Sequence, residues 1–274
     1  MQLSIITINR NNAAGLEKTM QSVLSQTRTD YEYVVVDGAS TDGSVAVIER
    51  LAPAFGDRLK WVSEPDKGIY NAMNKGIGMA TGEYIQILNS GDSLVSPEVV
   101  DRMYAAVERE NHPFILYGNL LKDLADGRMQ RDRSFAGEEM TLLGFFQGTL
   151  NHSPAYIRRS LFEKYGPYDE SLRIVSDWKW YLQAIVFGDE KPVYADIDIT
   201  LFDMSGISMT NEGLRISERS QVLRELVRPP ILSDYEEWTE DIRRIMRLRK
   251  HPWAYKIFWF LERVLFKLDK RKDK

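Results

Sequence analysis

The sequence predicts an α/β fold in which a largely parallel β-sheet is covered by helices on both faces. Short apolar runs rich in Val, Ile and Tyr alternate with stretches of helical periodicity through residues 1–108. Such alternation is typical of parallel strands joined by crossover helices. The chain has 274 residues, of which 43% are hydrophobic and 28% charged, so it is long enough to bury a large core.

Each predicted element in this first part rests on its own local pattern. Strands are expected where apolar or β-branched residues follow one another, and helices where apolar residues recur every three or four positions. The predicted strands span 3–8, 33–36, 59–62 and 84–88. The predicted helices span 16–24, 44–51, 69–79 and 97–108.

The regular alternation stops in the second part of the chain. Residues 119–158 mix short apolar runs with Asp, Gly and Arg turns. The later elements that the pattern supports are strands at 114–117 and 193–202 and a helix at 177–186. From Gly213 onward the pattern is helical and is interrupted only by prolines. We therefore predict one α/β domain at 1–212 and a helical C-terminal extension at 213–274.

The composition excludes several kinds of site and of targeting. The chain has no cysteine, which excludes disulfides, thiolate catalysis and Cys-bound zinc, and its three histidines are too few for a His-rich metal site. The first apolar run is short and lacks the basic flank of a secretory signal. No uncharged apolar run approaches the roughly 18 residues that a membrane-spanning helix needs. We therefore expect a cytoplasmic protein.

Acidic residues follow three of the predicted strands. Asp37, Asp66 and Asp92 each come at or just past a strand end. One such residue alone is most often a turn or helix cap, but the carboxyl ends of parallel strands meet at one rim, where ligands bind. Neither a G-x-G-x-x-G after the first strand nor a Walker A motif occurs, which disfavours a dinucleotide-binding dehydrogenase and a P-loop enzyme. Mg²⁺ or Mn²⁺ bound by oxygen ligands, together with a diphosphate, suits the residue types at this rim.

Six segments together indicate a family. They are T-I-N at 7–9, V-V-V-D-G-A-S-T-D-G-S at 34–44, D-K-G-I-Y-N-A-M-N-K-G at 66–76, A-T-G-E-Y-I-Q-I-L-N-S-G-D at 80–92, N-H-S-P-A-Y at 151–156 and S-D-W at 176–178. In this order, over residues 1–208, the chain resembles the inverting family-2 glycosyltransferases. The resemblance is to the non-processive bacterial enzymes that build polysaccharides. It implies the GT-A fold, a Rossmann-like mixed sheet that binds nucleotide-sugars.

The resemblance also implies roles for individual residues. Asp177 matches the catalytic base, and Asp92 matches the acid that bridges Mn²⁺ or Mg²⁺ to the sugar diphosphate. The nucleotide-sugar, expected to be a UDP-sugar, is bound in these relatives by residues that match Thr7, Asn9, Asp37, Asp66, Gly68, Asn89 and Gly91. Among these, Asp37 matches the carboxylate that binds uridine.

The chain departs from the family pattern at several positions. Many relatives carry acids where this chain has Asn89 and Gly91, so Asp92 is left as the single acid of the motif. Met73 replaces a commonly basic residue. The Q-x-x-R-W motif of processive synthases is absent, so we expect one sugar to be transferred per binding event.

Three residue types in or near the motifs call for a choice between a functional and a structural interpretation. His152 matches an active-site histidine of the family, yet a lone histidine is more often a hydrogen-bonded structural residue. Asp177 is also in place to cap the helix that it begins. Trp180 is best explained by core packing, whereas Trp178, beside the predicted base, is open to packing or to a sugar platform.

The C-terminal tail combines basic charge with an apolar helical face. Residues 242–274 hold 12 Lys or Arg and three Asp or Glu, although the whole chain has a net charge of −4. The apolar face consists of Trp253, Ile257, Phe260, Leu261, Val264, Leu265 and Leu268. A basic amphipathic helix suits an anionic membrane surface, and packing on the catalytic domain or on a second subunit is the equal alternative. Nucleic acid is disfavoured, because no binding module accompanies the charge.

The sequence thus predicts a metal-dependent, inverting hexosyltransferase in polysaccharide or O-antigen-type biosynthesis. It would act on a saccharide acceptor, lipid-linked if the tail docks at the inner face of the cytoplasmic membrane. Two alternatives stay open at this point: a sugar nucleotidyltransferase, and a catalytically inert subunit that binds nucleotide-sugar and scaffolds an assembly. The donor sugar, the acceptor hydroxyl and the oligomeric state are not determined by the sequence.

Overall fold

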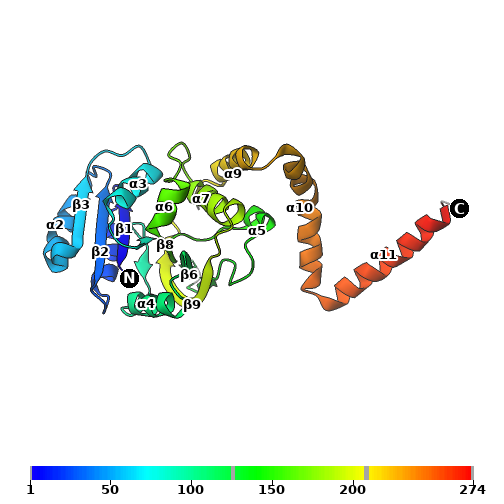
Figure 1. The fold of residues 1–274 in the computed structure, drawn as a ribbon, viewed down its shortest axis with the longest axis horizontal. Coiled ribbons are helices and arrows are strands. Elements are labelled where there is room, and N and C mark those ends of the chain that lie inside the picture. Colours follow the sequence, from blue (N-terminus) through cyan, green and yellow to red (C-terminus); the bar gives the residue numbers. More distant parts are fainter. Residues whose placement is uncertain (1, 125–126, 207–209, 273–274) are drawn as a thin grey trace. The chain divides into compact units, whose positions relative to one another are not determined.

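The computed structural model describes residues 2–124, 127–206 and 210–272 (Figure 1). They form two compact units, residues 1–219 and 220–274. The division falls inside α9 (Glu212–Leu226), a few residues beyond the predicted start of the helical extension.

Among the described residues, a nine-stranded mixed sheet forms the centre of the first unit (Figure 1). The strands are β1 (Leu3–Asn9), β2 (Tyr31–Asp37), β3 (Leu59–Ser63), β4 (Tyr84–Ile87), β5 (Ser93–Leu94), β6 (Ile115–Asp123), β7 (Met129–Asp132), β8 (Ala155–Arg158) and β9 (Val193–Phe202). Their spatial order is β3-β2-β1-β4-β8-β6-β9-β5, with β7 paired to β6. The strands β3, β2, β1 and β4 are parallel, as predicted, whereas β8 is antiparallel to both β4 and β6.

The first unit also contains helices, several of which pack on the faces of the sheet. They are α1 (Ala13–Leu24), α2 (Ser44–Phe55), α3 (Ile69–Met79), α4 (Val99–Arg109), α5 (Leu142–Gln147), α6 (Arg159–Tyr165) and α7 (Ser176–Tyr181), which continues as a π-helix (Leu182–Phe187). A short 3₁₀ turn, Gly56–Arg58, precedes β3. The predicted strands and helices of residues 1–108 are all present. The pattern missed β5, which has two residues, and β7, β8, α5 and α6, which lie where short apolar runs are mixed with turn residues and no clear periodicity develops.

Alternate residues of the central strands face two different layers. Ile5 and Val35 pack into the apolar cluster that α1, α2 and α4 share with the sheet. Ile6 and Val36 point to the opposite face, where α3 lies against β1 and β2. This period-2 alternation buries both faces, which explains why these strands are continuous apolar runs.

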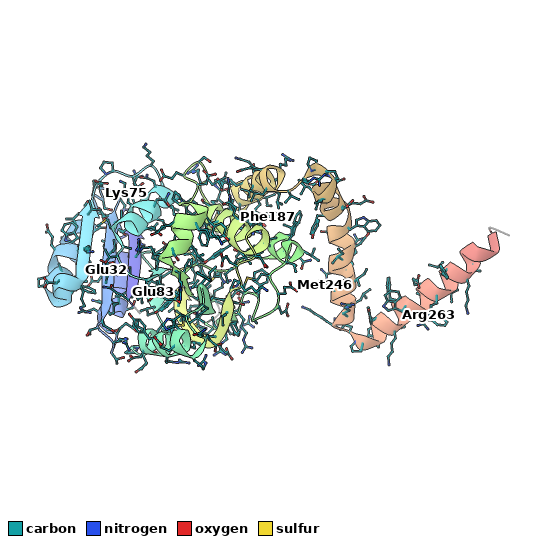
Figure 2. All side chains as sticks on the ribbon, in the orientation of Figure 1. Glu32, Lys75, Glu83, Phe187, Met246 and Arg263 are labelled. Carbon is teal, nitrogen blue, oxygen red and sulfur yellow. The ribbon has the colours of Figure 1, made fainter. Side chains whose placement is uncertain are left out.

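The two ends of the parallel strands differ in how their polar groups are satisfied. At the amino ends Glu32, labelled on β2 in Figure 2, accepts hydrogen bonds from Ser4 Oγ and from the Thr81 backbone and side chain, and pairs with Lys60. Burial opposes its ionisation, but these partners hold the pKa of Glu32 below its ordinary value. At the carboxyl ends, the parallel register aligns Asn9, Asp37 and Ser63 across three strands.

The second unit contains the end of α9, α10 (Pro229–Arg249) and α11 (Pro252–Lys272), on which Figure 2 labels Met246 and Arg263. The predicted amphipathic helix lies within α11, and its apolar side chains are exposed, with Trp253 69% and Phe260 66% accessible. Of the helices in the described ranges, none has the length and apolarity needed to cross a membrane. The basic run predicted at 270–274 lies outside the side chains that the structure describes.

The close approach of α3 to the sheet yields a stability prediction. A Cβ on Gly76 would overlap Cγ2 of Ile6, whereas a Cβ on Gly78, two residues later in the same helix, would meet nothing within 4 Å. We expect Gly76→Ala to lower the free energy of unfolding by about 1–3 kcal/mol through overpacking. Gly78→Ala, the matched control, should raise it by about 0.5–1 kcal/mol through helix propensity. Urea denaturation of both variants measures this, and a stabilised Gly76→Ala would contradict the described packing.

Candidate active site

A cavity of about 630 Å³ opens at the carboxyl ends of β1 and β4, within the first unit. Residues from the predicted motifs, far apart in the sequence, line it together. The predicted site residues in its wall are Asn9, Asp66, Gly68, Asn89, Asp92, His152 and Asp177. Thr7, Asp37 and Gly91 are not part of the wall. Of the acidic residues that the sequence placed at strand ends, Asp66 and Asp92 therefore share a cavity with Asp177, whereas Asp37 does not line it.

Asp177 lies in the first turn of α7, and its carboxylate is held by three donors. Oδ2 accepts from Nδ1 of His152 at 2.9 Å, and Oδ1 accepts from the backbone N–H of Trp178 at 2.9 Å. The Tyr70 hydroxyl lies 3.0 Å from Oδ1 and 2.6 Å from the carbonyl of Ile174, and its single proton serves one of them at a time. Burial opposes ionisation, but the bonds from His152 and Tyr70 keep the pKa of Asp177 below its ordinary value. The carboxylate stays charged with 16% of its side chain exposed to the cavity.

His152 contacts two other predicted site residues of the cavity wall, Asp177 and Asn89. Because a charged carboxylate only accepts hydrogen bonds, Nδ1 of His152 carries the proton shared with Asp177. Its other nitrogen, Nε2, lies 3.2 Å from Nδ2 of Asn89, which follows β4. Burial alone would lower the pKa of His152, but the nearby carboxylates of Asp177 and Asp92 raise it. The structure therefore gives this histidine a hydrogen-bonding role at the site, which the sequence left open.

Asp92 is the least satisfied buried carboxylate in the cavity wall. It is 2% exposed, its Oδ1 accepts from the backbone N–H of Asp203 at 2.8 Å, and its Oδ2 has no hydrogen-bond partner. Burial is the main reason that its pKa rises to about 7. No cluster of three or more His, Asp or Glu side chains suited to a metal ion occurs in the described part of the chain. A divalent cation at Asp92 would therefore need oxygen ligands from the donor's phosphates or from water, and the free Oδ2 fits such a cation.

Asp37 and Thr7 lie behind the wall and organise it. The carboxylate of Asp37 is fully buried and accepts four hydrogen bonds, two from Ser40 and one each from Asn9 Nδ2 and Ser63 Oγ. Thr7 Oγ1 donates to the carbonyl of Leu88. Asp37 thus orients Asn9, which does reach the cavity. The predicted contact of Asp37 with uridine stays a prediction.

The cavity also contains residues that the sequence did not indicate. Arg173, Arg215 and Arg219 form a basic part of its wall. Cζ of Arg219 lies 4.8 Å from the centre of the Trp178 ring, and burial, aided by the charge of Arg215, lowers the pKa of Arg219 to about 10. Trp178 itself is 2% exposed and its indole N–H donates to backbone carbonyls, so packing is its main role. No motif marks these arginines, because Arg215 and Arg219 on α9 and Arg173 before α7 are brought to the cavity only by the tertiary fold.

A carboxylate on α9 shapes the segment that carries Asp177. Glu218 is buried, and its two oxygens accept from the backbone N–H groups of Arg173, Ile174 and Val175 at 2.8–3.2 Å. These residues directly precede α7, and the Ile174 carbonyl is one of the two acceptors of Tyr70. Glu218 is therefore a positioning residue for the predicted base, placed about 40 residues later in the chain.

The comparison with known proteins assigns this site to a family. Residues 4–166, more than half of the chain, match Glycosyl transferase family 2. The chain belongs to this family. The glycosyltransferase is 27% identical over 251 residues to the PGL/p-HBAD biosynthesis glycosyltransferase of Mycobacterium bovis, covering 90% of this chain and 94% of that one. It is 32% identical over 213 residues to an uncharacterized glycosyltransferase of Mycobacterium tuberculosis, covering 77% and 78% respectively.

Solved structures establish the fold of the glycosyltransferase. S. aureus TarS 1–349, crystallised in complex with UDP-GlcNAc, superposes with a TM-score of 0.67 at 20% identity. The match covers 82% of this chain but 65% of that structure, slightly under two thirds of its length. A mannosyltransferase from Pyrobaculum calidifontis, in complex with GDP-Man and Mn²⁺, gives a TM-score of 0.64 at 17% identity, covering 93% and 72%. The predicted GT-A fold is confirmed.

The buried state of Asp92 predicts how stability depends on pH without metal. Between the ordinary Asp pKa of about 3.9 and the folded value of about 7, the folded protein holds a proton that the unfolded chain has released. The contribution of Asp92 to the free energy of unfolding therefore falls as pH rises from about 4 to about 7, and is constant above. Asp92→Asn should be more stable than the parent at pH 8, by about 4 kcal/mol at most, with a smaller difference at pH 5.

Urea denaturation in EDTA at both pH values measures this difference. Asp189→Asn is the matched control, because Asp189 is exposed and its φ of 56° suits asparagine. A difference between Asp92→Asn and the parent that is the same at pH 5 and pH 8 would contradict the described burial of Asp92.

Proposed function

We propose that the enzyme transfers one sugar from a UDP-sugar to a saccharide hydroxyl, with inversion at the anomeric carbon and Asp177 as the base. The single observation that carries this proposal is the shared cavity. It presents a charged, partly accessible carboxylate at Asp177 and a buried carboxylate with a free oxygen at Asp92. These are the two functions that the reaction needs, proton acceptance and binding of a metal–diphosphate.

The donor would lie along the carboxyl ends of the parallel strands. The nucleoside would lie toward Asn9, Asp66 and Gly68, and the diphosphate would extend toward Asp92. Mn²⁺ or Mg²⁺ held by Asp92 would neutralise charge that develops on the diphosphate as it leaves. The TarS complex with UDP-GlcNAc supports a UDP-sugar, and the mannosyltransferase complex with Mn²⁺ supports the cation.

The chemical step is a single displacement. The acceptor oxygen forms a bond to the anomeric carbon as the bond from that carbon to the diphosphate oxygen breaks, on the opposite face of the sugar. The acceptor hydroxyl gives its proton to Asp177, which His152 and Tyr70 orient. The nucleoside diphosphate leaves with the electron pair, and Arg215 and Arg219 add positive charge to the same cavity.

The two alternative functions that the sequence left open differ from a transferase in family and in activity. The family match argues against a sugar nucleotidyltransferase. A catalytically inert subunit would bind nucleotide-sugar but neither transfer nor hydrolyse it with any donor or metal. The ordered hydrogen bonds at Asp177 support an active enzyme, because a scaffold has no need of a buried, charged carboxylate that faces the cavity.

The base assignment predicts a loss of transfer with donor binding retained. Asp177→Asn keeps the size of the side chain but cannot accept the proton, so we expect the transfer rate to fall by roughly 10²–10⁴-fold. UDP binding, measured by calorimetry with Mn²⁺, should change little, since the change lies on the acceptor side. Asp189→Asn, an exposed control, should transfer at the parental rate. Near-normal transfer by Asp177→Asn would show that another group is the base.

We also propose that α11 attaches the enzyme to an anionic membrane surface, where a lipid-linked acceptor would be found. The exposed apolar residues of α11 lie beside basic ones at positions 256, 263 and 267. An apolar surface with adjacent cations suits the interface of a bilayer that contains acidic lipids.

Vesicle binding tests this attachment. The enzyme should co-sediment with phosphatidylglycerol vesicles more than with phosphatidylcholine vesicles, and less at high salt. Phe260→Ser should weaken binding roughly tenfold or more, because burial of one aromatic ring contributes about 1.5–3 kcal/mol. Trp238→Ser, which alters an exposed aromatic residue of α10, is the control and should bind normally. Failure to bind either vesicle, with a dimer found by analytical ultracentrifugation, would favour a protein partner for α11.

A further inference from the structure

A second carboxylate, which no sequence motif marks, lies beside Asp92. Asp203 directly follows β9, about 110 residues later in the chain, and its backbone N–H donates to Oδ1 of Asp92. Its side chain lines the same cavity as that of Asp92. The backbone hydrogen bond and the shared cavity place the two residues next to each other.

The place of the Asp203 side chain depends on Gly91. A Cβ built on Gly91 would overlap Oδ2 of Asp203 and lie 3.0 Å from its Cγ. Gly91 also has φ of +104°, which side chains rarely adopt. The glycine therefore leaves open a space next to Asp92, and the carboxylate of Asp203 fills it.

The negative charges of Asp92 and Asp203 are poorly compensated by hydrogen-bond donors and cations. One oxygen of Asp92 is buried and without a partner, and Asp203 uses Oδ1 to accept from the backbone N–H of Ser205. Neither side chain forms an ion pair with a Lys or Arg in the described ranges. Lys18 and His152 are the groups whose positive charge acts on Asp92, but Lys18 donates to the carbonyl of Gly91 and His152 bonds to Asp177. Two adjacent carboxylates, of which Asp92 is buried and Asp203 half-buried, are unfavourable unless a cation joins them.

We propose that Asp203 is the second protein carboxylate of the divalent-cation site, with Oδ2 acting together with Oδ2 of Asp92. The two carboxylates would supply hard oxygen ligands from one side, and the donor's diphosphate would complete the shell. This inference rests on the metal-dependent donor binding proposed above. It explains how a chain with a single acid in its fourth-strand motif offers the cation a second carboxylate.

Direct measurement of Mn²⁺ binding tests the proposal without relying on turnover. Free Mn²⁺ is followed by electron paramagnetic resonance while the full-length protein is titrated in the presence of UDP. Asp203→Asn keeps an oxygen for the Ser205 N–H but removes the charge, and it should weaken Mn²⁺ binding roughly tenfold or more. Asp196→Asn is the matched control, because Asp196 lies on β9, the strand that Asp203 follows, and 58% of its side chain is exposed. It should bind Mn²⁺ as the parent does.

Two reference measurements make the result specific. Asp92→Asn should also lose Mn²⁺ binding, and UDP binding in EDTA should be the same in the parent and in Asp203→Asn. Melting temperatures within a few degrees of the parent establish that the variants are folded, and Asp203→Ser repeats the test with a smaller side chain.

The outcomes separate this inference from the function on which it rests. Normal Mn²⁺ affinity in both Asp203 variants, with binding lost in Asp92→Asn, would overturn the role of Asp203 and leave the metal site at Asp92 intact. No Mn²⁺ binding by the parent in the presence of UDP would overturn the metal dependence itself, and with it the role of Asp203. Weakened binding in both Asp203 variants, with the control unchanged, supports the proposal.

Discussion

The cost of burying a carboxylate governs the arrangement of this site. A charged carboxylate in a protein wall must be matched by hydrogen-bond donors or by a cation. Asp37 receives four hydrogen bonds and Glu218 three, so both are fully used in holding backbone and side chains in place. Asp92 receives one, and its second oxygen is free. The difference separates the carboxylates that build the cavity from the one that has capacity left for a ligand.

The part of the cavity that holds Asp177 is assembled from segments that lie far apart in the chain. Asp177 lies on α7, but its orientation depends on Tyr70 of α3, on His152 in the loop before β8, and on Glu218 of α9. Each contact joins segments that are tens to more than a hundred residues apart. A substitution at any of these three residues would therefore alter the orientation of the proposed base, Asp177, even if the substituted residue itself contacts no substrate.

The wall of the cavity carries charges of both signs. Asp66, Asp92 and Asp203 contribute negative charge, and Arg173, Arg215 and Arg219 contribute positive charge. A nucleotide-sugar with its cation carries both signs, because the metal–diphosphate is positive at the ion and negative at the phosphate oxygens. Such a wall suits this ligand better than a neutral saccharide alone, which would need neither sign of charge.

The sequence by itself determined the first half of the sheet, its helices and the family. Buried parallel strands are continuous apolar runs, and acidic residues at their carboxyl ends are local in the chain, so Asp66 and Asp92 were identified from the pattern. Asn9 and Asp177 were identified from the family resemblance. It also predicted α11 from a helical apolar face. Only the tertiary structure showed that Asp37 lies behind Asn9, that His152 bonds to Asp177, and that Asp203 fills the space beside Gly91. These facts depend on contacts between distant segments, and hydrophobic periodicity does not encode such contacts because it reports only which face of each element is buried.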